Sequence, residues 1–343
     1  MPAPRVEENE KEGVATVSAS HEKFLVTGAG GCIGAWAIKL LRDEGVDVVA
    51  SDVSEDLRRL ELVSYPGKPD AEFVALDVTS TEDVQRVVHE RDVTHIIHLA
   101  GLQFPFCAAN PPLGARVNVG GLVNIFDAIR TADRRIGLAY ASSAAVFGAS
   151  SAYSGGIIGD ASPLMPDSHY GVYKAANEGT ARIYSLSNGI GSIGLRPFIV
   201  YGPGRDQGMT SDATKAILAA VAGTPFKFKF GGNMLLTYAP DCARAFIGSA
   251  RASAGSGDSL CLNVPGQRVG VAELVALIER LIPESAGMLT WESTPISAPA
   301  LLSAPALESA IGQVTNRPLV DGVTETIEHF RAVLGAGLLS APE

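Results

Sequence analysis

The chain has 343 residues, a length that predicts one large domain with a smaller lobe, or two domains. Apolar residues make up 46% and charged residues 19%, which is typical of a globular protein, and a net charge of −10 argues against a general nucleic-acid binder. Scattered cysteines without paired spacing predict reduced thiols, with no structural disulfide and no metal site. They are Cys32, Cys107, Cys242 and Cys261.

Residues 1–22 are polar and acidic, and they lack the apolar core of a signal peptide. We expect them to form a flexible arm ahead of the folded chain. The sequence contains no run of about 18 apolar residues, so it predicts no membrane span. A cytoplasmic location is expected by default.

A strand, a glycine-rich turn and a helix are predicted in succession from Lys23 onward. Residues 24–26 form an apolar run typical of a strand buried on both faces. Gly28, Gly31 and Gly34 then permit a tight turn, close approach of backbone to a pyrophosphate, and close helix–strand packing. Because free N–H groups at a helix start favour a bound phosphate, this context predicts a dinucleotide site rather than an ordinary strand–helix turn.

An acidic residue ends the second predicted strand, residues 46–52. Asp52 lies roughly 20 residues beyond the glycines, where a carboxylate binds the ribose hydroxyls and repels a 2′-phosphate. The sequence therefore favours NAD over NADP. Arg58 and Arg59 follow closely and leave NADP open, and a loop acid or helix cap is the structural alternative for Asp52.

Strands and helices continue to alternate, which predicts an α/β fold with a doubly wound parallel (Rossmann) sheet. His95 and His98 lie three apart on one predicted strand, so they face opposite ways and we expect packed or hydrogen-bonded rings rather than metal ligands. Strands are predicted at 72–76, 93–99 and 137–141, helices at 81–90 and 118–130, and a loop at 102–112.

Tyr170 and Lys174 stand four residues apart in a predicted helix, so their side chains share one face. A tyrosine with a pKa near 10 is a poor base at neutral pH, and a nearby ammonium lowers that pKa. Tyr170 is therefore a candidate acid/base and Lys174 its charge partner and a ligand for the nicotinamide ribose. Tyr173 has no lysine at the matching spacing.

These motifs together resemble the extended short-chain dehydrogenase/reductase family, also described as NAD-dependent epimerases and dehydratases. The matching segments are TGxxGxxG at 27–34, SSxxVFG at 142–148, YxxxK at 170–174 and LRPFIVYGPGR at 195–205. The family usually has Tyr where this chain has Phe147. The resemblance covers about residues 23–335 and implies that Ser143 holds the reacting oxygen by a hydrogen bond beside Tyr170.

The resemblance also implies a division of the chain and a set of ligand contacts. The Rossmann domain would comprise 23–197 and about 238–264, and a smaller C-terminal substrate lobe would comprise 198–237 and 265–343. Residues 285–310 are rich in Ser, Ala and Pro, which predicts irregular structure there. NAD contacts are implied at Gly28, Gly31, Cys32, Ile33, Gly34, Asp52, Asp77, Val78, Leu99, Ala100, Gly101, Asn118, Tyr170 and Lys174. Substrate contacts are implied at Gln103, Ser142, Ser143, Phe198 and Arg205.

Two departures from nucleotide-sugar members of the family concern the substrate. Ile199 stands where those members often have Asn, and Met234 and Leu235 stand where they carry an Arg-Asp pair that grips a diphosphate. We therefore predict an NAD-dependent oxidoreductase acting on a secondary alcohol of a small, hydroxylated, sugar-like substrate. A nucleotide-sugar 4-epimerase of the UDP-glucose type is the enzyme alternative, and an NAD-sensing regulatory protein is the non-enzyme alternative. A homodimer is expected, because this family commonly pairs through helices that match 112–133 and 168–188.

Overall fold

The central feature of the computed structural model is a seven-stranded sheet in the order β3-β2-β1-β4-β5-β6-β10, with every neighbouring pair parallel. The structure describes residues 22–67, 71–149, 152–153, 157–208, 210–296 and 302–342, so the predicted arm lies outside the described residues except for Glu22. Chain order reverses between β1 and β4, and ligands of open α/β sheets bind in the crevice at such a switch point. The strands are β1 (Lys23–Thr27), β2 (Asp47–Asp52), β3 (Glu72–Ala75), β4 (His95–His98), β5 (Gly137–Ala141), β6 (Ser192–Arg196) and β10 (Ser259–Asn263).

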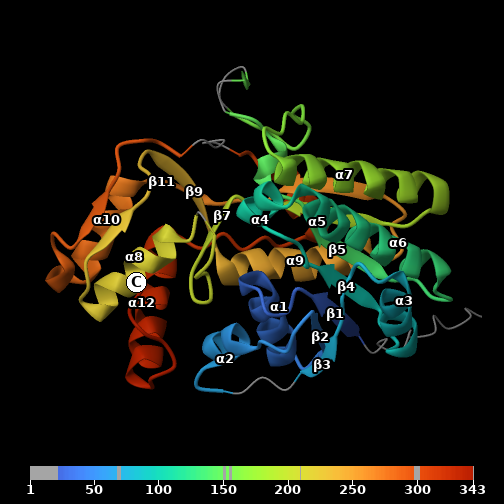
Figure 1. Ribbon diagram of the computed structural model, residues 1–343, viewed down its shortest axis with the longest axis horizontal. Helices are drawn as coiled ribbons and strands as arrows, with labels where there is room; N and C mark the ends of the chain where they lie inside the picture. The colour runs from blue at the N-terminus through green and yellow to red at the C-terminus, as the bar shows by residue number, and fades with distance from the viewer. Residues whose placement is uncertain are drawn as a thin grey trace, which may run out of the picture.

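Helices cover both faces of this sheet, which confirms the predicted doubly wound fold (Figure 1). Alternating strand residues point to opposite faces, so Phe24 and Val26 enter one core while Leu25 enters the other. The first face packs α1 (Cys32–Asp43), α2 (Arg58–Ser64), α9 (Ala239–Ser253) and α11 (Pro305–Ile311). The second packs α3 (Thr81–Glu90), α6 (Gly121–Thr131) and α7 (His169–Asn188).

A smaller lobe with its own apolar core lies beside the Rossmann sheet (Figure 1). Its two small sheets have the orders β11-β9-β7 and β12-β8. Its strands are β7 (Ile199–Tyr201), β8 (Phe226–Phe228), β9 (Asn233–Tyr238), β11 (Gln267–Gly270) and β12 (Leu289–Trp291). Its helices are α8 (Asp212–Ala222), α10 (Val271–Leu281), the 3₁₀ turn η4 (Pro283–Ser285) and α12 (Leu319–Gly335). No helix in the described parts of the chain is long and apolar enough to cross a bilayer.

Two segments differ from the sequence-based expectation. The predicted loop at 102–112 folds into α4 (Phe104–Ala109) and α5 (Pro111–Ala115), and a π-helical turn, η1 (Arg116–Gly120), joins them to α6. Proline suggested a loop, but each of these helices carries its proline in the first turn, where no intrahelical N–H is required. The predicted irregular segment 285–310 contains β12 and overlaps η4 and α11, and α11 packs on the face of the Rossmann sheet that α9 covers.

Candidate active site

The glycine turn after β1 is shaped so that side chains cannot occupy it. Gly28 has φ +74°, and a Cβ there would lie 2.7 Å from the Ala100 nitrogen. A Cβ on Gly34 would lie 2.4 Å from the Gly28 oxygen. No side chain caps α1 at Gly31, so the first N–H groups of this helix stay available for an anion. The turn therefore fits the pyrophosphate of a dinucleotide.

The neighbouring side chains of α1 have partners within the protein. The Cys32 thiol faces the Pro203 carbonyl oxygen at 3.7 Å, and burial raises its pKa to about 12. Ile33 packs against the first-face core. These two predicted cofactor contacts can therefore be made through backbone N–H groups, and the thiol is an unreactive neutral group at ordinary pH.

Asp52 ends β2 directly beside the glycines. Its carboxylate accepts hydrogen bonds from the Gly30 N–H at 3.0 Å and the Val53 N–H at 2.8 Å. It also lines a cavity of about 290 Å³, together with the glycine turn and residues 204–207. The structure thus brings Asp52 to the same cavity as Gly30 and Gly31, as a dinucleotide site requires.

The segments after β3 and β4 approach the same end of the sheet. The Leu99 N–H donates to the Thr27 carbonyl at 3.1 Å, which places Leu99 and Ala100 against the glycine turn. Asp77 is exposed and accepts the Thr79 N–H at 2.9 Å, whereas Val78 is buried. Asp77 and Val78 follow the carboxyl end of β3, where Asp77 is open to solvent and Val78 packs against α6.

Asn118 presents an unsatisfied acceptor on the π-helical turn. It is 1% exposed, and its Nδ2 donates to the carbonyl oxygens of Leu102 at 3.2 Å and Gly114 at 3.1 Å. Its Oδ1 has no hydrogen-bond partner among the described residues, and a Cβ on Gly101 would lie 2.7 Å from it. A buried acceptor without a donor is costly, so this oxygen is suited to a ligand.

Lys174 is a buried cation on α7. It is 4% exposed, and its Nζ donates to the Ala141 carbonyl at 2.7 Å and lies 5.6 Å from the centroid of the Tyr170 ring. Burial lowers its pKa from 10.5 to about 8, while the nearby Cys107 thiol opposes that shift. The predicted helix is present, and Ser168 caps its start by accepting the Gly171 N–H. The predicted shared face is present too, because the Lys174 ammonium lies over the Tyr170 ring.

The surroundings of the Tyr170 phenol both raise and lower its pKa. Burial raises the pKa of Tyr170, whereas a hydrogen bond with Ser143 and the charge of Arg205 lower it. We expected Lys174 to be the group that lowers this pKa, but its Nζ faces the Tyr170 ring. Ser143 follows β5 at the start of the 3₁₀ turn η2 (Ala144–Val146), and its Oγ accepts the Ala145 N–H at 3.1 Å. The structure thus brings Ser143, Tyr170 and Lys174 together.

Ser142 serves a buried ion pair that the sequence analysis did not find. Its Oγ donates to Glu178 Oε1 at 2.5 Å, and Glu178 pairs with Arg196 through two contacts of 2.7 Å. Arg196 and Glu178 are 4% and 6% exposed. The hydroxyl of Ser142, predicted to contact substrate, therefore points into the protein. An arginine at the end of a buried strand is a weak sequence signal that an acid must lie nearby.

Two of the five predicted substrate residues, Gln103 and Arg205, border two adjoining cavities. Gln103 lines both, whereas Arg205 lines the one beside the glycine turn and Phe198 packs against the core of the lobe. Arg205 donates to Thr210 Oγ1 at 3.2 Å, and its Nε has no partner among the described residues. The second cavity has a volume of about 710 Å³. Its lining includes Pro105, Phe106, Lys215, Lys229, Phe230 and Ile296.

The positions that argued against a diphosphate lie inside the lobe. Ile199 and Met234 are fully buried in its core, and Leu235 is 4% exposed. None of the three lines either cavity. Their side chains provide no contact to an anion, and the cations that border the second cavity are Lys215 and Lys229.

Comparison with known proteins identifies the family. Residues 24–260 match the model of the NAD dependent epimerase/dehydratase family. The chain belongs to this family. It is accordingly an enzyme of the extended short-chain dehydrogenase type, and its cofactor is NAD. The predicted fold, enzyme class and cofactor are thereby confirmed.

Similar proteins include a protein of unknown role and two that involve UDP-sugars. An uncharacterized 37.6 kDa protein of Escherichia coli O111:H- is 33% identical over 236 residues, 66% of this chain and 68% of that one. A UDP-glucose 4-epimerase of Mycolicibacterium smegmatis is 28% identical over 90% of this chain and 98% of its own. The structure of MoeE5 in complex with UDP-glucose and NAD has a TM-score of 0.74 at 25% identity and covers 91% of this chain and 99% of its own.

Proposed function

We propose that this family member oxidises a secondary alcohol of a small, hydroxylated, sugar-like substrate with NAD. The observation that carries the proposal is the meeting of Ser143, Tyr170 and Lys174. Ser143 is close enough to the Tyr170 phenol to lower its pKa, and the Lys174 Nζ lies 5.6 Å from the centroid of the Tyr170 ring. An alcohol placed against the phenol would have a proton acceptor and a hydrogen-bond donor on its oxygen.

The chemistry of this chain's own residues follows from their surroundings. NAD, when bound, supplies the acceptor for the hydride that leaves the carbinol carbon. Tyr170 takes the hydroxyl proton from the same carbinol, so that oxidation leaves a neutral ketone. The Ser143 hydroxyl bonds the carbinol oxygen, and the Lys174 ammonium orients the nicotinamide ribose while its bond to Ala141 fixes its own position.

The residues around the first cavity would hold the dinucleotide. Backbone N–H groups at the start of α1 would bind the pyrophosphate, and the Asp52 carboxylate would bind the adenosine ribose. The unsatisfied Asn118 Oδ1 would accept a hydrogen bond from the nicotinamide half. We propose further contacts at Gly28, Gly31, Cys32, Ile33, Gly34, Asp77, Val78, Leu99, Ala100 and Gly101.

A nucleotide-sugar 4-epimerase is the second candidate. The similarity to a UDP-glucose 4-epimerase over nearly its whole length supports it. A second cavity of about 710 Å³, bordered by Lys215 and Lys229, also has room for a nucleotide and positive charge for its phosphates. The buried Ile199 and Met234 argue the other way, because neither can hold a diphosphate.

A substrate screen separates the two candidates. The purified enzyme is incubated with NAD and with sugars, sugar acids or UDP-sugars, and both NADH absorbance and products are followed. We expect NADH to accumulate with a free sugar or sugar acid, and UDP to leave the melting temperature unchanged. Formation of a C4 epimer without net NADH, together with stabilisation by UDP, would replace this proposal with the epimerase.

A further inference from the structure

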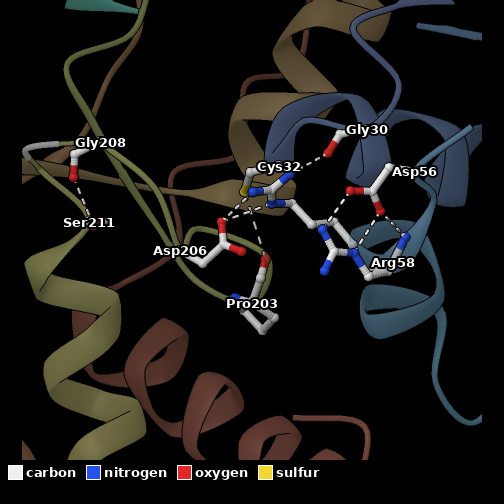
Figure 2. A network of polar contacts seen from close by, with 9 residues as sticks. Gly30, Cys32, Asp56, Arg58, Pro203, Asp206, Gly208 and Ser211 are labelled. Atoms are coloured by element: carbon white, nitrogen blue, oxygen red, sulfur yellow. Dashed lines mark hydrogen bonds and ion pairs between the residues drawn. The ribbon is translucent and has the colours of Figure 1, made fainter. Parts of the chain in front are cut away.

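The loop that follows β7, residues 202–208, lies directly across from the glycine turn. The Trp36 indole N–H donates to the Pro203 carbonyl at 2.9 Å, and the Cys32 thiol faces the same oxygen. Figure 2 shows Pro203 and Asp206 approaching the region of Gly30 and Cys32. Two parts of the chain some 170 residues apart are therefore held together at the mouth of the cofactor site.

One arginine bridges these two parts. Arg59 Nη1 donates to the Gly30 carbonyl oxygen at 2.7 Å. Its Nε and Nη2 lie 2.8 and 2.7 Å from Asp206 Oδ1. The Arg59 side chain is 19% exposed, so this pair is better shielded than an ordinary surface pair, although Asp206 is 56% exposed. We call the Arg59–Asp206 pair the strap.

The strap borders the cavity that would hold the dinucleotide. Gly30, Gly31 and Asp52 line one side of this cavity of about 290 Å³, and residues 204–207 line the other. Arg59 spans the two sides, and it lines the cavity itself. A dinucleotide seated on the glycine turn would therefore lie between that turn and residues 204–207.

Loop 202–208 contains glycines where a movement of the loop can begin. Gly202, Gly204 and Gly208 have φ of +122°, +86° and +93°, which L side chains rarely adopt. Each end of the loop thus has a residue with wide conformational freedom. The fixed points between them are the Pro203 carbonyl and the Asp206 carboxylate, and the second is an ion pair that can break and re-form.

We propose that the strap closes loop 202–208 over bound NAD and slows its release. Arg59 and Asp206 act as positioning residues, and neither needs to contact the reacting atoms. Release of the cofactor is then slower than it would be from an open loop, and it is not prevented. This inference concerns the cofactor, so it stands whether the substrate is a free sugar or a nucleotide sugar.

Binding kinetics of NADH, measured by stopped-flow fluorescence without any substrate, test the strap. The variants are Arg59→Ala, Asp206→Asn and the double variant, each checked for an unchanged circular dichroism spectrum and melting profile. The matched control is Arg58→Ala, because Arg58 is 85% exposed and pairs locally with Asp56 at 2.7 Å. These arginines are adjacent, and Arg59 alone of the two reaches Asp206.

We expect Arg59→Ala and Asp206→Asn each to raise the dissociation rate about fivefold, the factor that a partly shielded ion pair supports. The double variant should release NADH no faster than either single variant, and Arg58→Ala should match the wild type. Association should not slow in any variant, because an open loop does not hinder entry. Faster NADH release from Arg59→Ala, with an unchanged rate in Asp206→Asn, would indicate a direct contact between Arg59 and the cofactor and would overturn the strap. Unchanged release rates in both variants would also overturn it.

Discussion

Replacing Lys174 with methionine should make the protein more stable at neutral pH. The ammonium is 4% exposed, and burial lowers its pKa from 10.5 to about 8. At 1.36 kcal/mol per pH unit, this difference corresponds to ~3 kcal/mol of destabilisation while the group is charged in both states. Loss of the bond to the Ala141 carbonyl offsets about 1 kcal/mol. The expected net gain in the free energy of unfolding is ~2 kcal/mol.

The sign of the pH dependence distinguishes this cause from a general packing effect. Below pH 8 Lys174 is protonated in both the folded and unfolded chain, so the full burial cost is present. Between pH 8 and 10.5 the folded state loses this proton first, so the stability of the wild type rises relative to Lys174→Met. Above that window the advantage of the variant disappears.

Urea denaturation of both proteins without NAD, at several pH values from 7 to about 10.5, measures this difference. Lys227→Met is the matched control, because Lys227 is 61% exposed in its pair with Glu292 and should change stability by less than about 1 kcal/mol at any pH. A destabilised Lys174→Met at pH 7, or a difference that is flat with pH, would refute the reasoning.

Three further substitutions probe the ion pair, the glycine turn and the cofactor preference. Glu178→Ala should lower the free energy of unfolding by about 3–5 kcal/mol in urea, because it strands the buried Arg196 charge; a loss below about 1 kcal/mol would contradict this. Gly34→Ala should abolish NAD binding in a titration, since its Cβ would lie 2.4 Å from a backbone oxygen, whereas Gly120→Ala meets open space and should bind normally. Asp52→Ala should weaken NAD and narrow its advantage over NADP when both are titrated, and an unchanged ratio would remove Asp52 from the ribose site.

The Rossmann sheet was predictable because its strands are short apolar runs whose alternate residues enter two separate cores. Phe24 and Leu25, adjacent in sequence, pack on opposite faces of β1. The segment after β4 was harder, because proline within the first turn of α4 and α5 has the same sequence signature as a loop. Some strands of the lobe, such as β8, are only three residues long and depend on pairing with distant segments.

The candidate site was predictable where one local motif supplies the geometry. Tyr170 and Lys174 share a helix face, so their spacing alone brings them together. Pairs that join distant segments leave no such signal: Arg59 and Asp206 are 147 residues apart. The same limit explains why the charge that lowers the pKa of Tyr170 was assigned to Lys174 rather than to Arg205, which lies in the loop after β7.

The central claim is that Tyr170 is the proton acceptor, and two tyrosine variants test it most directly. Tyr173 lies on the same helix, but its hydroxyl donates to the Pro111 carbonyl at 2.9 Å. With the substrate found by the screen, Tyr170→Phe should lower turnover by at least about 10²-fold while NAD affinity is retained, because the ring stays and the transferring oxygen is lost. Tyr173→Phe should retain turnover. An active Tyr170→Phe beside an inactive Tyr173→Phe would contradict the assignment of Tyr170, and of Ser143 with it.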